Sequence, residues 1–170
     1  MRTILRCVVV GVLAAAFGVP VFAAGQGAAG VTKDLKGWRD VAWGATPDQV
    51  SASIGKPLSE QVKGEDSRTY FRIRDYSVGA WTTNLVVIFS GAERLGLSSV
   101  MINFRKDTEF KPVVDELTAR YGAPTSTKRE TENGIDIQEA SWLFPSTEVT
   151  CRWRGPWGIV VYQPRAKGTS

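Results

Sequence analysis

Histidine is absent from this sequence, and cysteine occurs only twice in its 170 residues. Histidine is the usual general base near neutral pH and the commonest side-chain ligand of transition metals. The sequence also has no glycine-rich phosphate loop, no calcium-binding loop and no nucleophile-elbow motif. We therefore expect a protein that is not an enzyme and that carries neither a metal ion nor a cofactor.

Two kinds of residue remain as candidates for catalysis. Cys151 alternates with the core-type residues Val149 and Trp153, so we expect a buried, inert thiol rather than a nucleophile. Acidic side chains cluster near predicted turns at Glu65, Asp66, Glu130, Glu132 and Asp136. Paired carboxylates can act as acid and base, but acidic residues at turns are usually just solvated, so catalysis by them is the less favoured interpretation.

The N-terminal segment has the pattern of a secretory signal peptide. Two arginines precede an apolar stretch at 8–19, and small residues follow it. We predict a signal peptide over 1–23, cleaved after Ala23 or Ala24, and hence a periplasmic or secreted protein. The apolar stretch is short for a transmembrane helix, so no transmembrane segment is expected after cleavage, and an uncleaved anchor is the alternative.

Removal of this segment would change both the charge and the cysteine chemistry. Arg2 and Arg6 leave with it, so the net charge falls from +4 to about +2, and no nucleic-acid partner is expected. Cys7 leaves as well, and Cys151 is then the single cysteine, without a partner for an intrachain disulfide. Because Cys7 precedes the apolar stretch, it does not stand where a lipid-attachment cysteine would.

The remaining chain divides into a flexible lead-in at 24–37, a single globular domain at 38–164 and a frayed tail at 165–170. A helix is predicted at 46–54, where Thr46 and Pro47 suit its start and Gly55 its left-handed end. A second amphipathic helix is predicted at 108–121. An arm at 38–43 is expected to lie against the first helix.

Alternation of apolar and polar residues predicts eight strands. They are expected at 58–63, 67–76, 84–90, 97–105, 125–132, 135–144, 147–154 and 157–163. The residues expected to face inward are Phe71, Ile73, Leu85, Val87, Phe89, Val100, Ile102, Phe104, Val149, Cys151 and Trp153. Asn133-Gly134 is a strong hairpin signal.

Side by side, the two halves of the chain give similar patterns. Gly55-Lys-Pro57 corresponds to Gly122-Ala-Pro124, and Val100-Ile102 corresponds to Ile159-Val161. We therefore predict an α+β fold with a tandem repeat of a helix followed by a four-stranded antiparallel sheet, at 38–106 and 107–164. The repeats are expected to form one continuous sheet with the helices on one face.

The face of this sheet turned away from the helices is the predicted binding site. It should present Tyr70, Arg72, Arg74, Arg105, Arg152 and Arg154. Arginine and aromatic side chains on a rigid sheet are typical of protein interfaces, and the planar guanidinium favours carboxylates on the partner. We therefore expect a protein partner with an acidic patch; a plain solvated sheet face is the alternative. The six tryptophans are assigned mostly to core or sheet-edge packing.

The sequence also resembles a known family. Gly44-Ala-Thr-Pro-Asp-Gln-Val50, Gly55-Lys-Pro57, Tyr70 and Leu85-Val-Val-Ile-Phe89 resemble the small-protein-A type domain of the lipoproteins of outer-membrane barrel assembly. Two such units in tandem resemble the β-lactamase inhibitory protein architecture. That resemblance implies two helix-plus-four-strand repeats whose concave sheet grips a partner protein.

These observations favour a non-catalytic periplasmic or secreted protein-binding module. Its most concrete form is an inhibitor or immunity-type protein that grips a partner with its sheet face. The alternative is an accessory protein of envelope or outer-membrane assembly. A further possibility is a small-ligand carrier with a pocket between the repeats, which a cavity with convergent polar groups would support.

Overall fold

The computed structural model describes residues 34–63, 68–91, 94–105 and 108–165. The predicted signal peptide, most of the predicted lead-in and nearly all of the predicted tail lie outside these residues. So do the two acidic candidates Glu65 and Asp66. None of the helices within the described residues is long and apolar enough to cross a membrane.

Strands dominate the structure: they hold 54% of the described residues, whereas the helices hold 16%. In chain order the elements are β1 (Gly37–Trp38), β2 (Val41–Ala42), α1 (Pro47–Ile54), β3 (Gln61–Lys63), β4 (Thr69–Val78), β5 (Trp81–Ser90), β6 (Gly96–Phe104), α2 (Phe110–Tyr121), β7 (Ser126–Glu132), β8 (Ile135–Leu143), β9 (Thr147–Arg154) and β10 (Trp157–Pro164).

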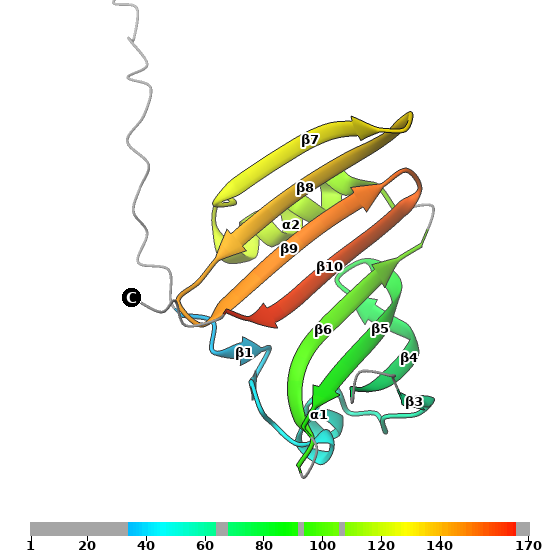
Figure 1. The fold of residues 1–170 in the computed structure, drawn as a ribbon, viewed down its shortest axis with the longest axis vertical. Coiled ribbons are helices and arrows are strands. Elements are labelled where there is room, and N and C mark those ends of the chain that lie inside the picture. Colours follow the sequence, from blue (N-terminus) through cyan, green and yellow to red (C-terminus); the bar gives the residue numbers. More distant parts are fainter. Residues whose placement is uncertain (1–33, 64–67, 92–93, 106–107, 166–170) are drawn as a thin grey trace, which may run out of the picture.

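One long antiparallel sheet forms the body of the molecule (Figure 1). Its strand order is β3-β4-β5-β6-β10-β9-β8-β7, with the three-residue β3 at one edge. Strands next to each other in the sheet are also next to each other in the chain, except at the centre. There β6 pairs with β10, and Asn103 lies opposite Ile159. This central pairing joins the strands β3 to β6 and the strands β7 to β10 into one sheet.

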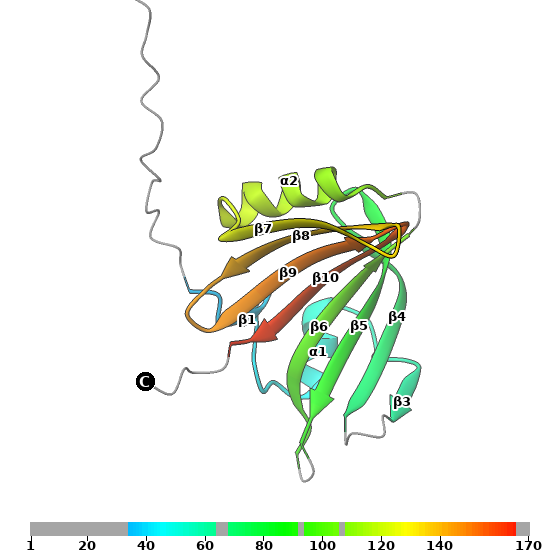
Figure 2. The ribbon, with the colours of Figure 1, turned by 45° about the horizontal axis from the view of Figure 1, so that its top comes forward.

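Both helices lie on one side of the sheet, behind it in the view of Figure 1, and Figure 2 shows α2 running above β7 and β8. Val50 of α1 and Val113 and Leu117 of α2 join the strands in one core cluster. All of the predicted inward-facing residues are buried in this cluster, as expected from the alternation. The predicted inward side of these strands is therefore confirmed.

The predicted helices are also present. Thr46 caps α1 in a reciprocal capping box with Gln49, and Gly55 ends it with a left-handed φ of 71°. The second helix begins at Phe110, two residues after the predicted start. The predicted arm at 38–43 contains β2 and Trp38 of β1, whereas Gly37 of β1 lies in the predicted lead-in, and β2 contacts α1.

The predicted fold class, an α+β tandem repeat of a helix followed by a four-stranded sheet, is wrong. The protein is mostly β, and its second sheet, formed by β1 and β2, precedes α1. The two helix ends that suggested the repeat also differ, because Gly122 has a ψ of −174° whereas Gly55 has 21°. Glycine followed by proline ends helices in many unrelated folds, so this signal does not establish a repeated unit.

The proposed correspondence of Val100-Ile102 with Ile159-Val161 is wrong as well. Val100 and Ile102 are buried on the helix side, but Ile159 and Val161 are only half-buried. Their neighbours Val160 and Tyr162 face the core instead, at 1% and 4% exposure. The two segments therefore face opposite sides of the sheet, because a shift of one residue exchanges the faces of a strand.

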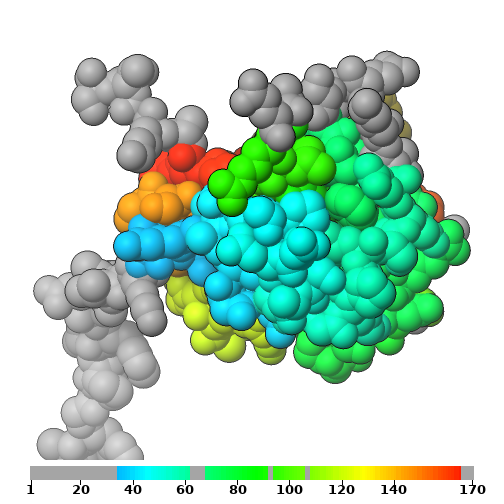
Figure 3. Space-filling view, turned by 90° about the horizontal axis from the view of Figure 1, so that it is seen from below, coloured from blue at the N-terminus to red at the C-terminus, as the bar shows by residue number. Residues whose placement is uncertain are grey.

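The first described residues form hydrogen bonds with the turn between β8 and β9 and with the start of β9. Asp34 accepts hydrogen bonds from the backbone N–H and the hydroxyl of Ser146, at 2.9 and 2.7 Å. Trp43 Nε1 donates to Thr147 Oγ1 at 2.8 Å. Figure 3 shows the blue residues at the start of the described chain lying against the orange and red strands. These contacts hold the β1–β2 sheet against the main sheet on the helix side.

Gly158 of β10 provides a test of how tightly the core is packed. A Cβ at this position would lie 2.0 Å from Trp153 Cζ2. The Trp153 ring cannot easily yield, because it is wedged between Phe104 and Phe110 with centroid distances of 5.4 and 5.8 Å. We predict that Gly158→Ala lowers the free energy of unfolding by about 1–3 kcal/mol or more, measured by urea denaturation.

The neighbouring variant Ile159→Ala is the control, since it removes side-chain atoms from the opposite face without creating overlap. Ile159→Ala should lower the free energy of unfolding by less than Gly158→Ala does. A Gly158→Ala protein as stable as the parent would contradict the packing described for Trp153.

Candidate functional site

The candidate site is the sheet face turned away from both helices, which we call the outer face. Arg72 and Arg74 reach it from β4, Arg105 from the residue after β6, and Arg152 and Arg154 from β9. All five arginines are exposed. They come from three parts of the chain, and the pairing of β6 with β10 brings them onto one surface.

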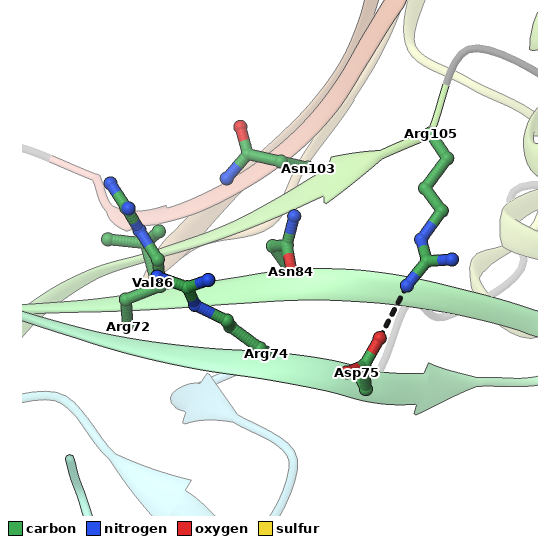
Figure 4. A pocket seen from close by; sticks show the side chains of 7 residues that line it. All are labelled: Arg72, Arg74, Asp75, Asn84, Val86, Asn103 and Arg105. Carbon is green, nitrogen blue, oxygen red and sulfur yellow. Dashed lines mark hydrogen bonds and ion pairs between the residues drawn. The ribbon is translucent and has the colours of Figure 1, made fainter. Parts of the chain in front are cut away.

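Two adjoining hollows run across the outer face. The first, of about 560 Å³, is lined by Arg72, Arg74, Asp75, Asn84, Val86, Asn103 and Arg105 (Figure 4). The second, of about 590 Å³, is lined by Asn84, Asn103, Phe104, Arg105, Arg152, Arg154, Trp157, Gly158 and Ile159. Because they share Asn84, Asn103 and Arg105, they form one continuous hollow that contains five of the six predicted site residues.

Tyr70 is the predicted site residue that the structure places outside these hollows. It is half-buried and pairs across β4 and β5 with Ile88, which is 5% exposed. Ile88 belongs to the outer side of β5 and not to the main core cluster. Tyr70 therefore lies at the margin of the candidate site rather than within it.

Four of the five arginines are held by nearby acidic side chains. Arg105 reaches across β5 to Asp75, as Figure 4 shows. The other pairs are Arg74 with Glu60 at 3.0 Å, Arg154 with Glu132 at 3.5 Å and Arg152 with Glu139 at 3.7 Å. Exposed ion pairs contribute only about 0–1 kcal/mol each, so a partner can replace these carboxylates at small cost.

Arg72 differs from the other four. Within the described residues it forms neither an ion pair nor a side-chain hydrogen bond. Its whole set of five N–H donors is consequently available to a partner. Arg72 is therefore the strongest attachment point for a carboxylate on this face.

An apolar strip separates the arginines of the two halves. Arg72 pairs with Val86, which pairs with Met101, and Met101 pairs with Val161. Residues directly opposite one another in antiparallel strands point to the same face, and these three apolar side chains are half-buried. The outer face thus combines an apolar centre with charged surroundings, which is the composition of a protein interface.

Trp157 is the residue of this site that the sequence analysis missed. It is 61% exposed, the most exposed of the large apolar side chains in the described residues. It lines the second hollow and also a third one of about 630 Å³, together with Ile135 and Arg154. The sequence feature that could have revealed Trp157 is the two-residue turn at Gly155-Pro156. This turn places Trp157 directly opposite the outward-facing Arg154.

The remaining acidic candidates form ion pairs with basic side chains. Glu130, Glu132 and Asp136 lie at the β7–β8 hairpin and pair with Lys128 at 2.7 Å, Arg154 at 3.5 Å and Arg129 at 3.9 Å. Across the described residues, no group of three or more histidine, cysteine, aspartate or glutamate side chains is arranged to hold a metal ion.

Cys151 is fully buried, as predicted, at 0% exposure. Desolvation by burial disfavours the thiolate and raises the pKa of Cys151 from 9.0 to about 12. A thiol in this state is a poor nucleophile and a poor metal ligand.

Comparisons of this chain with protein-family models, with curated proteins and with solved structures found no match.

The state of Cys151 has two measurable consequences. We predict that the folded protein resists thiol-specific labelling at mildly alkaline pH and that unfolding in guanidinium chloride makes Cys151 react fully. Because the folded state retains the thiol proton that the unfolded state loses, the free energy of unfolding should fall between pH 9.0 and about 12.

The control is Cys151→Ala. Its free energy of unfolding should fall less steeply with pH, because the contribution of the thiol is lost while those of lysines and tyrosines remain. Stoichiometric labelling of the folded protein, or identical alkaline slopes for the two proteins, would contradict the assignment.

Proposed function

We propose that this protein is a non-catalytic, periplasmic or secreted binding module that grips a partner protein with its outer face. The observation that carries the proposal is the continuous hollow lined by five arginines and the exposed Trp157. Arginine and tryptophan are among the residues most enriched at the energetic centres of protein interfaces.

The composition of the outer face favours an acidic partner. Arg72 has all of its donors available, and the four paired arginines are pre-oriented by three exposed carboxylates and the half-buried Glu139, which a partner's carboxylates can replace. The apolar centre at Val86, Met101 and Val161 supplies surface whose burial stabilises a complex. A rigid sheet also loses little conformational freedom on binding.

The most concrete form of this function is inhibition of, or immunity to, an enzyme of the cell envelope or the extracellular space. The predicted signal peptide supports that location. A broad sheet face suits a protein that covers another protein's active site.

A second function, that of an accessory in envelope assembly, has one specific observation in its favour. The segment Gly44-Ala-Thr-Pro-Asp-Gln-Val50 resembles the small-protein-A type domain, and Thr46 and Gln49 form a capping box at the start of α1. Fractionation separates the two functions, because an accessory should travel with outer-membrane complexes and an inhibitor with soluble protein.

The deciding experiment is affinity capture of the protein's partner from its own cell envelope at moderate salt. Recovery of one soluble protein in stoichiometric amount supports the inhibitor or immunity function. Recovery of outer-membrane assembly proteins supports the accessory function. A protein that captures neither from the envelope or from the culture medium would contradict both.

For the captured partner, we predict that Arg72→Glu weakens binding by about 1–3 kcal/mol, since it reverses a charge beside the apolar centre of the outer face. Trp157→Ala should weaken it by a similar amount through loss of apolar contact. Binding should also weaken as salt is raised. Isothermal titration calorimetry measures all three effects.

Lys111→Glu is the matched control, because Lys111 is an exposed cation on α2, at the opposite side of the sheet. It should bind as the parent does. Unchanged affinity in both Arg72→Glu and Trp157→Ala would remove the outer face as the binding site, even if the partner is real.

A further inference from the structure

A separate cavity of about 380 Å³ opens on the helix side of the sheet. Its lining residues are Leu35, Trp38, Arg39, Tyr76, Ser77, Val78, Gly79, Ile102, Arg120, Tyr121 and Tyr162. They come from β1, the far end of β4, β6, the last turn of α2 and β10. This helix-side cavity shares no lining residue with the outer-face hollows.

The inner wall of the helix-side cavity is apolar, aromatic and firmly packed. Trp38, Tyr76, Ile102 and Tyr162 are each between 3% and 7% exposed. They belong to the main core cluster, so the inner wall of the cavity is part of the core, whereas Arg39 and Arg120 at its rim are exposed. Its volume is within the usual range of small-molecule sites, which are mostly apolar with a few convergent polar groups.

Two guanidinium groups line this aromatic wall. Arg39 donates from Nη1 to Tyr76 Oη, and its guanidinium carbon lies 5.7 Å from the centroid of the Trp38 ring. Arg120 donates to Glu116 Oε1 at 2.9 Å. The described residues that line the cavity include no aspartate or glutamate. The nearby carboxylates, Glu116 beside Arg120 and Asp40 beside Arg39, lie outside the lining, so two cations face the cavity itself.

The tyrosine hydroxyls add to this surplus of donors. Tyr121 and Tyr162 share a single hydrogen bond of 3.4 Å, which uses one of their two hydroxyl protons. Burial raises the pKa of Tyr162 well above its usual value, so the hydroxyl stays protonated. Tyr76 accepts from Arg39, and no interaction within the described residues uses the proton of its own hydroxyl. The cavity thus offers donors from two guanidinium groups and from tyrosine hydroxyls, and the described residues that line it include no carboxylate.

Arg39, which lines this cavity, has an unusual backbone conformation. It has a φ of 56° in the two-residue turn between β1 and β2, a position that glycine, asparagine or aspartate fills more easily. Non-glycine residues in such conformations are concentrated at functional sites, where the surrounding structure stabilises them.

We propose that the helix-side cavity binds a small organic carboxylate with an aromatic or aliphatic body. The carboxylate accepts hydrogen bonds from Arg39, Arg120 and the tyrosine hydroxyls, which supply the donors that its oxygens need. The body packs against Trp38 and its aromatic neighbours. This site is independent of the outer face, so its ligand and the partner protein bind to opposite sides of one sheet.

Phenylpropionate is a suitable probe, with phenylpropanol and phenylpropylamine as neutral and cationic analogues of nearly the same shape. We expect phenylpropionate to bind with a Kd of about 1 mM or tighter, detected by tryptophan fluorescence and by NMR shifts of Trp38 and Tyr162. The alcohol should bind about tenfold more weakly, and the amine should show no saturable binding.

Two variants test the role of the guanidinium groups. Arg39→Gln and Arg120→Gln should each weaken phenylpropionate binding about tenfold while leaving the affinity for phenylpropanol unchanged. Arg129→Gln is the control, since Arg129 is an exposed arginine of β7 that lines neither the helix-side cavity nor the outer-face hollows. Thermal unfolding of each variant checks that the fold is intact.

The proposal is overturned if phenylpropionate shows no saturable binding at about 10 mM, if the alcohol binds equally well, or if the NMR shifts map elsewhere on the protein. Retention of full affinity in both arginine variants would also overturn it. None of these results depends on whether a partner protein binds to the outer face.

Discussion

The antiparallel pairing of β6 with β10 is the interaction on which the rest of the structure depends. It joins two groups of strands that are otherwise paired only with their neighbours in the chain. Without it, Arg72, Arg74 and Arg105 would lie on one surface and Arg152 and Arg154 on another. The same junction pairs Tyr162 of β10 with Val100 and Val160 with Ile102 of β6, which brings Tyr162 and Ile102 into the wall of the helix-side cavity. Both candidate sites are therefore products of one set of backbone hydrogen bonds.

Side-chain alternation gives the two faces of this sheet different chemistry. On the helix side, Phe71, Phe89, Phe104 and Trp153 make edge or tilted ring contacts within one core. On the outer side, exposed arginines surround half-buried apolar residues. Because the period of a strand is two, a single chain can build a densely packed interior and a charged binding surface only a sheet's thickness apart.

Local sequence predicted most of the elements and much of the outer face. The capping box at Thr46, the Asn133-Gly134 turn and the inward residues of β4, β5, β6 and β9 all follow from short-range rules. The arginines were placed correctly because they alternate with buried neighbours. The correspondence of Val100-Ile102 with Ile159-Val161 was wrong because nearly every residue from Trp157 to Tyr162 is apolar, so the sequence of this strand does not show which face is inward.

The sequence by itself determined where the strands of the main sheet and the two helices lie, and which side chains of the clearest strands face inward. Only the tertiary structure decided that β1 and β2 form a separate sheet, that β6 pairs with β10, and that Arg39 and Arg120 line the same cavity. The physical reason is the range of the interactions. Caps, turns and alternation act over a few residues. The pairing of β6 with β10 and the hydrogen bond between Asp34 and Ser146 instead join residues far apart in the chain, so no single segment of sequence predicts them.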